Sequence, residues 1–296
     1  MLLPPSDLDL SDLRRMLADQ YGTDAEPRFV PLGEDSWCYR AGGLWVSLRR
    51  DLRGHHPAAY AAAHSLARSG CDFVLAPLAG RDGRIAHDVG GIPALVFPYV
   101  VAEPLDAATA SPRTIADAIT LMGRVHAAGS EVALSREDYR LDFEQDIDTT
   151  VDCGSGGVRE TGPYTVRLVG LVKRHLHTIS GLRTELADLA AACAASEDPM
   201  VLTHGEPRAQ NILVAENGLL FADWGDAMWG PPERDWFHFL ETLGQAPPCR
   251  PDFLRFYQVR WILSEIAEYG THFLAPHDGD EEDAAMWDRL TAFIPE

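Results

Sequence analysis

The sequence predicts an α+β fold, in which a small β-rich N-terminal part precedes a larger, mainly helical C-terminal part. Between residues 28 and 100, short apolar segments alternate as strands do and are separated by turn residues. After residue 111, apolar side chains recur with the helical period over long stretches. The 296 residues are enough for two lobes with a shared cleft.

The N-terminal part is expected to hold two helices and several strands. Residues 6–20 carry apolar side chains at helical spacing after a Ser-Asp start, and an Ala-rich helix is expected over residues 57–69, ending at Gly70. Strands are expected at 30–40 (strand, turn and strand), 45–50, 73–77, 85–87 and 94–100.

Helices dominate the expected C-terminal part. One begins at Ser111, a typical N-cap, with Pro112 in its first turn, and runs to residue 128. Residues 131–164 are less regular and rich in Asp and Glu. Further helices are expected over residues 164–195, 232–245 and 251–274.

Two short motifs, at residues 204–211 and 223–225, indicate function. Glu206, with Arg208 two residues later and Asn211 five residues later, matches the acid, cation and amide spacing of a kinase catalytic loop. Asp223 follows after an apolar hairpin, as the metal-binding Asp does in kinases. Either motif alone is common, as a chance triplet or a turn. Their order and their connection by a hairpin predict a phosphoryl-transfer centre.

Each residue type in these motifs has a chemical reason. The Glu206 carboxylate suits the acceptance or alignment of a substrate hydroxyl proton. Mg²⁺ prefers oxygen ligands, which Asn211 and Asp223 supply. Arg208 is placed to contact the transferring phosphate. Residues 212–215 and 219–222 predict a hairpin that returns Asp223 beside Asn211, so that one ion contacts both.

The segment 201–241 resembles the aminoglycoside phosphotransferase family, whose pattern is His-Gly-Asp-x-x-x-x-Asn followed by Asp-[Trp/Phe]-Gly-Asp. Its Gly-Glu-Pro triplet and the Pro-Pro-Glu-Arg-Asp run at 231–235 most resemble the spectinomycin-phosphotransferase-like branch. The resemblance implies a protein-kinase-like fold with an N-terminal lobe over residues 1–98 and a C-terminal lobe over residues 99–296. It also implies ATP and Mg²⁺ as cofactors, and a structural role for Asp235 next to the catalytic loop.

The chain departs from this pattern in several places. The family's catalytic Asp is Glu206 here, and its His is Arg208. The only Lys of the chain is Lys173, so the strand Lys that holds phosphates in kinases is missing. Arg49, or failing that Arg50, is the candidate replacement, against the alternative of an exposed Arg at a strand end. The helix expected over residues 57–69 also lacks the Glu that pairs with that Lys.

Three further residues are candidates for nucleotide binding. By the family pattern, the Pro98 carbonyl and the Val100 amide contact adenine, the alternative being a buried strand that ends in a Pro bend. Ser36 is a candidate phosphate contact in a turn that contains only Gly33 and no Gly-rich motif. An ordinary hairpin explains that turn equally well.

Composition narrows the class of protein. A net charge of −20 disfavours nucleic acid as a partner and suits either a cationic substrate or simple solubility. No apolar run is long enough for a bilayer, and the first residues lack signal-peptide features, so a soluble cytoplasmic protein without membrane partners is expected. Five cysteines without a CxxC motif argue against a disulfide framework or structural zinc.

The function expected from these features is ATP-dependent transfer of a γ-phosphoryl group to a hydroxyl of a small, cationic antibiotic such as an aminoglycoside or spectinomycin. The acidic residues between 137 and 152 suit such a substrate, although a solvated helix face is the simpler interpretation. Two alternatives stay open: a metabolic kinase for choline, an amino acid or a sugar, and a nucleotide-binding pseudokinase without turnover. The missing Lys and Glu favour the pseudokinase, whereas Asn211 and Asp223 oppose it.

Overall fold

The structure is a computed structural model that describes residues 4–5, 8–32, 36–49, 56–129 and 133–294. The chain forms two compact units. Unit 1 comprises Met1–Arg136 with Pro199–Pro247, and unit 2 comprises Glu137–Asp198 with Pro248–Glu296. Unit 1 therefore contains residues from both predicted lobes, and the lobe boundary at residues 98 and 99 stays a prediction.

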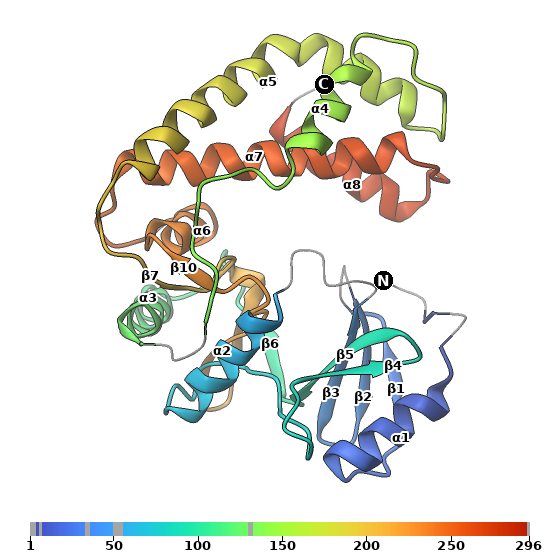
Figure 1. The fold of residues 1–296 in the computed structure, drawn as a ribbon, viewed down its shortest axis with the longest axis vertical. Helices are drawn as coiled ribbons and strands as arrows, with labels where there is room; N and C mark the ends of the chain where they lie inside the picture. Colours follow the sequence, from blue (N-terminus) through green and yellow to red (C-terminus); the bar gives the residue numbers. More distant parts are fainter. Residues whose placement is uncertain (1–3, 6–7, 33–35, 50–55, 130–132, 295–296) are drawn as a thin grey trace. The chain divides into compact units, whose positions relative to one another are not determined.

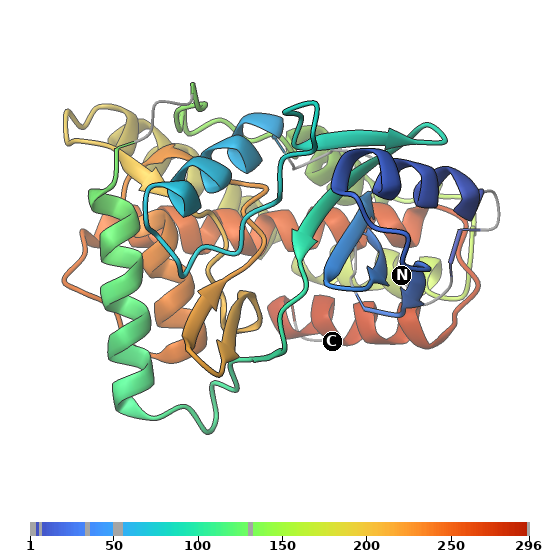
Figure 2. The same cartoon turned by 90° about the horizontal axis from the view of Figure 1, so that it is seen from below.

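A five-stranded antiparallel sheet forms the N-terminal part of unit 1. Helix α1 (Leu10–Tyr21) packs on one face of this sheet, where its buried leucines meet side chains of the central strands (Figure 1 and Figure 2). The strand order is β1 (Arg28–Val30), β2 (Ser36–Ala41), β3 (Leu44–Arg49), β5 (Ile92–Pro98) and β4 (Ala86–Val89).

The two faces of this sheet have different roles. Val46 and Leu48 belong to the core against α1. Because side chains alternate along a strand, Ser47 and Arg49 lie on the opposite face. In the β2–β3 ladder Cys38 is opposite Ser47 and Ser36 is opposite Arg49. This second face therefore carries a row of small or polar side chains that ends in an arginine.

The rest of unit 1 surrounds the predicted catalytic motifs. The hairpin predicted after Asn211 is confirmed, with β8 paired to β9 and Ala215 opposite Gly218, whose φ of 128° suits glycine. The elements are α2 (Pro57–Arg68), β6 (Ala102–Pro104), α3 (Pro112–Ala127), β7 (Val201–Thr203), the short 3-10 helix η1 (Ala209–Asn211), β8 (Ile212–Ala215), β9 (Gly218–Phe221), β10 (Met228–Gly230) and α6 (Glu233–Leu243). Strand β6 pairs with β8, and β10 pairs with β7.

Unit 2 is helical, with α4 (Glu144–Cys153), α5 (Thr165–Ala194), α7 (Pro251–Leu274) and α8 (Glu281–Phe293). Helix α7 packs against the other three. It approaches α4 closely at Gly270, where a Cβ atom would lie 2.2 Å from Thr150 Oγ1. Within the described part of the chain, no helix is long and apolar enough to cross a membrane.

The predicted order of a β-rich part followed by a mainly helical part is confirmed, and one local prediction is wrong. Residues 73–77 are not a strand of the N-terminal sheet, because their backbone instead bonds to Phe221, through Phe221 N–H to Phe73 O and Leu75 N–H to Phe221 O. The acidic segment 278–283 is mostly exposed, but two of its carboxylates make local hydrogen bonds. Asp280 caps α8, and Asp283 accepts hydrogen bonds from Gly279 N–H and the His272 ring.

Candidate active site

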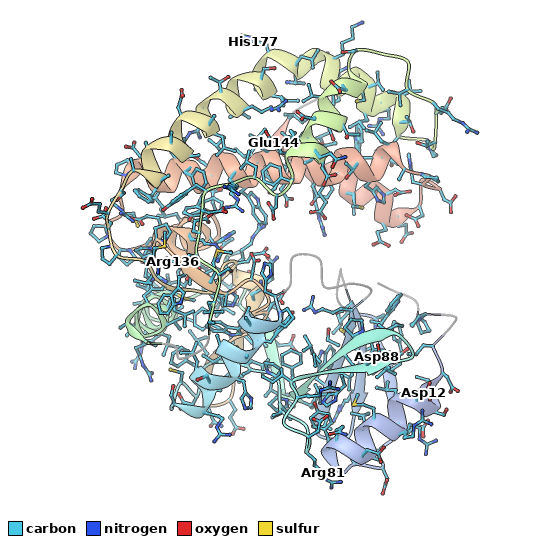
Figure 3. The ribbon with its side chains drawn as sticks, in the orientation of Figure 1. Asp12, Arg81, Asp88, Arg136, Glu144 and His177 are labelled. Atoms are coloured by element: carbon cyan, nitrogen blue, oxygen red, sulfur yellow. The ribbon has the colours of Figure 1, made fainter. Side chains whose placement is uncertain are left out.

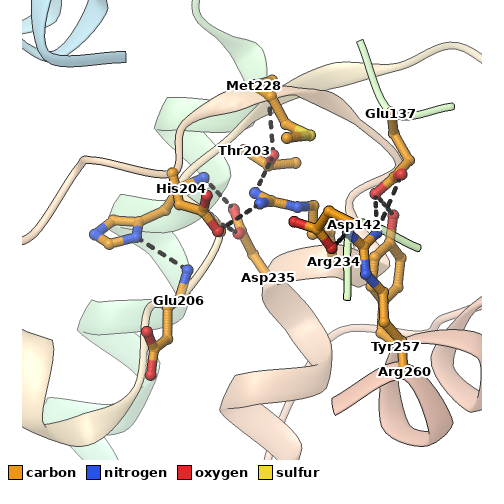
Figure 4. A network of polar contacts seen from close by, with 12 residues as sticks. Glu137, Asp142, Thr203, His204, Glu206, Met228, Arg234, Asp235, Tyr257 and Arg260 are labelled. Atoms are coloured by element: carbon orange, nitrogen blue, oxygen red, sulfur yellow. Dashed lines mark hydrogen bonds and ion pairs between the residues drawn. The ribbon is translucent and has the colours of Figure 1, made fainter. Parts of the chain in front are cut away.

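One buried carboxylate, that of Asp235 in the first turn of α6, holds the backbone at the start of the segment 204–206. It accepts hydrogen bonds from the backbone N–H groups of His204 (2.9 Å, Figure 4) and Gly205 (2.8 Å). Its Oδ2 also lies 2.8 Å from His126 Nε2. Burial alone would raise the pKa of Asp235. The hydrogen bond and charge of His126 and the N–H of Gly205 outweigh it and lower the pKa to about 2. The anchor is therefore an ionised carboxylate.

Gly205 is the residue that this close packing requires. Its φ of 107° is unfavourable for other residues. A Cβ atom at this position would lie 2.6 Å from Arg234 Nη1 and 2.9 Å from Asp226 Cβ. Arg234 itself is fixed by hydrogen bonds to Thr203 Oγ1 (3.1 Å) and Asp226 Oδ2 (2.9 Å). The glycine of the motif thus allows the chain to pass directly over an ion pair.

His204 connects the catalytic loop to the end of the hairpin. Its ring is fully buried, and Nε2 lies 2.8 Å from the Ala222 carbonyl, which can only accept. Nδ1 then accepts the N–H of Glu206 at 3.3 Å. Burial lowers the pKa of His204, in agreement with this neutral tautomer. The imidazole therefore acts as a bridge between Glu206 and the residue before Asp223.

Asn211 makes the second connection between the loop and the hairpin. Its Nδ2 donates to the Glu206 carbonyl at 2.9 Å, and its own carbonyl accepts from Ala222 N–H at 2.9 Å. Asp223 follows at once with a φ of 59°, a left-handed conformation that is costly for a residue with a side chain. The structure thus brings Glu206, Asn211 and Asp223 together.

The donor set of this site fits a magnesium ion. With Nδ2 engaged, Asn211 has its amide oxygen left as a ligand atom, and Asp223 adds a carboxylate. Among the described residues, no group of three or more His, Cys, Asp or Glu side chains is arranged to hold a metal. Mg²⁺ is commonly bound by one or two carboxylates together with substrate phosphates and water. The site therefore suits an ion that arrives with a nucleotide.

Two cations lie beside these acids. Arg208 Nη1 is 3.9 Å from Glu206 Oε1, and about a third of each side chain is exposed. Arg49, at the end of β3, places Nη2 at 3.2 Å from Asp223 Oδ1, and its side chain is only 9% exposed. The interpretation of Arg49 as an exposed strand-end arginine is therefore wrong. Arg50 and Gly33 lie outside the described residues.

The remaining candidates for nucleotide binding lie along β2, β3 and β5. Ser36 is buried opposite Arg49 and its Oγ is 3.5 Å from Cys38 Sγ. Pro98, the last residue of β5, is opposite Leu44 at the start of β3, and half-buried Val100 follows two residues later. The adenine and phosphate candidates thus lie at opposite ends of β3, and their contacts with nucleotide stay predictions.

Comparison with known proteins assigns the chain. Residues 46–269 match the phosphotransferase enzyme family, APH. The chain belongs to this family. It is 45% identical over 289 residues to Protein StrN of Streptomyces griseus. The aligned region covers 94% of this chain and 90% of that protein.

Solved structures show the same fold. Spectinomycin phosphotransferase, APH(9)-Ia, in complex with ADP and spectinomycin, is 16% identical with a TM-score of 0.78, over 97% of this chain and 95% of that chain. Amicoumacin kinase hAmiN in complex with AMP-PNP and Ca²⁺ is 13% identical with a TM-score of 0.60, over 97% and 93% of the two chains. The protein is thus a small-molecule phosphotransferase with a kinase-like fold, as the motifs predicted.

Some acidic side chains between residues 137 and 152 of this phosphotransferase are engaged by other residues of unit 2. Glu137 is buried and accepts hydrogen bonds from Tyr257 Oη (3.1 Å) and Arg260 Nη1 (Figure 4). Asp142 lies 3.7 Å from Arg260. In contrast, Glu144 is exposed in the first turn of α4 (Figure 3). Glu137 is therefore a structural residue, whereas Glu144 is one of the acidic side chains of this stretch that stay exposed.

Two residues of the site gave little signal in the sequence. His126 occupies an ordinary packing position near the end of α3, yet it contacts Asp235, which lies 109 residues away. His238, on α6, is buried and hydrogen-bonded to the Gly205 backbone. The spacing of three residues between Asp235 and His238 places both on one face of a helix, which is the only hint that the sequence offers.

Proposed function

We propose that this phosphotransferase moves the γ-phosphoryl group of ATP to a hydroxyl of a small, cationic, antibiotic-like molecule. The main support is that Asn211 bonds the Glu206 backbone while its own backbone bonds the residue before Asp223. These bonds link the residue that we propose as the base to the two that we propose as metal ligands. A pseudokinase that binds nucleotide could use the two metal ligands, but it would have no need of the base beside them.

In this proposal each side chain has one task. Glu206 accepts the proton of the acceptor hydroxyl while the hydroxyl oxygen bonds to the γ-phosphorus. The bond from the γ-phosphorus to the oxygen that bridges it to the β-phosphate breaks, and ADP leaves. Asn211 and Asp223 hold Mg²⁺, which when bound neutralises charge on the phosphate oxygens. Arg208 and Arg49 contact the phosphates.

Adenine binding and the class of substrate complete the proposal. The Pro98 carbonyl and the Val100 N–H receive the adenine at the end of β5. A chain of net charge −20 attracts cations, and a third of the Glu206 side chain is open to an acceptor. Spectinomycin or another aminoglycoside is the first candidate, because the fold is that of a spectinomycin phosphotransferase. A macrolide is the second.

The test is a panel of acceptors incubated with the protein, ATP and Mg²⁺, and analysed for phosphorylated product by mass spectrometry. Spectinomycin, other aminoglycosides and a macrolide represent the proposal, and choline, an amino acid and a sugar represent a metabolic kinase. Product from an antibiotic that disappears in Glu206→Ala supports the proposal. Product only from a metabolite, or nucleotide binding without any product, contradicts it.

A further inference from the structure

Arg49 lies between a carboxylate and an aromatic ring. On one side its Nη2 is 3.2 Å from Asp223 Oδ1. On the other side its Cζ lies 5.8 Å from the centre of the Tyr60 ring, which is inside the range of a cation–π contact. Both residues are buried, at 7% and 2% exposure. Tyr60 comes from α2, the helix in which kinases carry a glutamate for the strand cation.

Helix α2 is fixed to the same turn that carries Asp223. The N–H of His56, its N-cap residue, donates to the Gly225 carbonyl at 2.9 Å. Further along, His64 Nδ1 lies 2.9 Å from the Pro77 carbonyl. Residues 57–68 contain no Asp or Glu, so this helix offers Arg49 no carboxylate. What it offers within reach is the ring of Tyr60.

We propose that Tyr60 is a positioning residue that holds the Arg49 guanidinium toward the phosphates of the bound nucleotide, in place of the helix glutamate of kinases. The inference rests on the proposed function, since it assumes that Arg49 contacts phosphate. The ring limits the directions that the guanidinium can take, and Asp223 fixes its far end.

Using an arginine for the strand lysine of kinases and a tyrosine for the helix glutamate has a physical reason. A guanidinium is planar and weakly hydrated, and it stacks on aromatic faces better than an ammonium does. Burial raises the pKa of Tyr60, the charge of Arg49 lowers it by less, and the charges of Asp223 and Asp226 raise it further, so the ring stays neutral. Because those two carboxylates are already near, a third one from α2 would cancel the positive charge that phosphates require. A tyrosine holds the arginine without that cost.

The experiment measures nucleotide affinity apart from turnover, by calorimetric titration of Mg·ADP without acceptor. Tyr60→Met removes the ring but keeps an apolar side chain, and Tyr60→Leu is the second replacement if the first does not fold. We expect an affinity loss of about 3- to 30-fold, the range that a buried cation–π contact represents. Tyr60→Phe restores the ring and should recover most of the affinity.

A matched control separates positioning from packing. Leu66 is buried on the same helix, and Leu66→Ala should lower the melting temperature without weakening Mg·ADP binding. In the background of Arg49→Gln, replacement of Tyr60 by Met should cost less than about twofold in affinity, because the ring acts through the arginine.

Three outcomes would overturn the inference, and they differ from failure of the proposed function. Tyr60 is not a positioning residue if Tyr60→Met binds Mg·ADP as the wild type does. The same holds if Tyr60→Met loses no more affinity for Mg·ADP than Leu66→Ala does. It also holds if Tyr60→Met causes the full affinity loss in the Arg49→Gln background. If the wild-type protein itself binds no Mg·ADP, both this inference and the proposed function fall. If it binds Mg·ADP and phosphorylates nothing, only the proposed function falls.

Discussion

The catalytic segment at residues 201–235 and the cation at the end of β3 are held in different ways. In the catalytic segment, side chains bond to backbone groups: Asp235 to two N–H groups, His204 to Ala222 O, and Asn211 to Glu206 O. Arg49 instead depends on side chains, a carboxylate 174 residues away and a ring on the next helix. A backbone bond restricts which residue type fits. Side-chain partners can be exchanged together, and we propose that an arginine and a tyrosine take the places of a lysine and a glutamate here.

Asp223 is the one residue that belongs to both regions, so its loss should have the largest effect. We expect Asp223→Ala to reduce turnover by at least about 10³-fold, because a metal ligand and the partner of Arg49 are removed at once. Magnesium titration of the residual activity should show that the dependence on the ion is gone.

Asp226, three residues later, provides the control for this variant. It pairs with Arg234, and Asp226→Asn keeps an oxygen for that contact. The control variant should therefore retain the magnesium dependence of the wild type. An unchanged response to magnesium in Asp223→Ala would remove Asp223 from the metal site.

Glu206 tests the catalytic segment alone. We expect Glu206→Ala to lower kcat by a factor of about 10² to 10⁴, because the acceptor hydroxyl loses its base, with little change in KM for ATP. Glu206→Asp shortens the side chain by one methylene and introduces the family's usual acid, so it should retain more activity than the alanine variant. Steady-state rates for both nucleotide and acceptor decide the matter, and near-normal turnover of Glu206→Ala would exclude the role.

The sequence predicted the catalytic segment well and the second region less well. Spacing within a motif reports which residues a short loop can bring together, so the proximity of Glu206, Asn211 and Asp223 was predictable. Periodicity reports which face of an element is buried, but not what it packs against. The contacts of His126 with Asp235 and of Tyr60 with Arg49 were therefore out of reach. Residues 73–77 were assigned to the wrong sheet for the same reason.

Gly205 tests how tightly backbone contacts restrict the catalytic segment. Gly205→Ala should lower the free energy of unfolding by about 2 to 5 kcal/mol, the sum of an unfavourable φ and a collision with Arg234. Gly218→Ala is the matched control. Its φ is also positive, at 128°, but no atom lies within 4 Å of the added Cβ. Urea denaturation of both variants should show the smaller loss for Gly218→Ala, and equal losses would mean that the close packing at Gly205 is unimportant.

Acid should also test the catalytic segment, because His204 within it and His238 on the adjacent helix α6 are buried. Burial lowers the pKa of His238 to about 3, well below the value near 6.5 of an unfolded chain. As the pH falls below 6.5, the unfolded state binds a proton that the folded state does not, so stability falls with pH. For His238 this loss reaches about 2 kcal/mol at pH 5. Burial of His204 acts in the same direction.

The contribution of His238 is measurable by substitution. Denaturation at pH 7, 6 and 5 should show that His238→Gln loses about 2 kcal/mol less stability across this range than the wild type does, because glutamine does not titrate. His177, which is exposed on α5, is the control, and His177→Gln should follow the wild-type curve. A parallel curve for His238→Gln would show that the imidazole titrates equally in both states. The hydrogen bond between His238 and the Gly205 backbone would then be accessible to water, contrary to the buried contact that the structure shows.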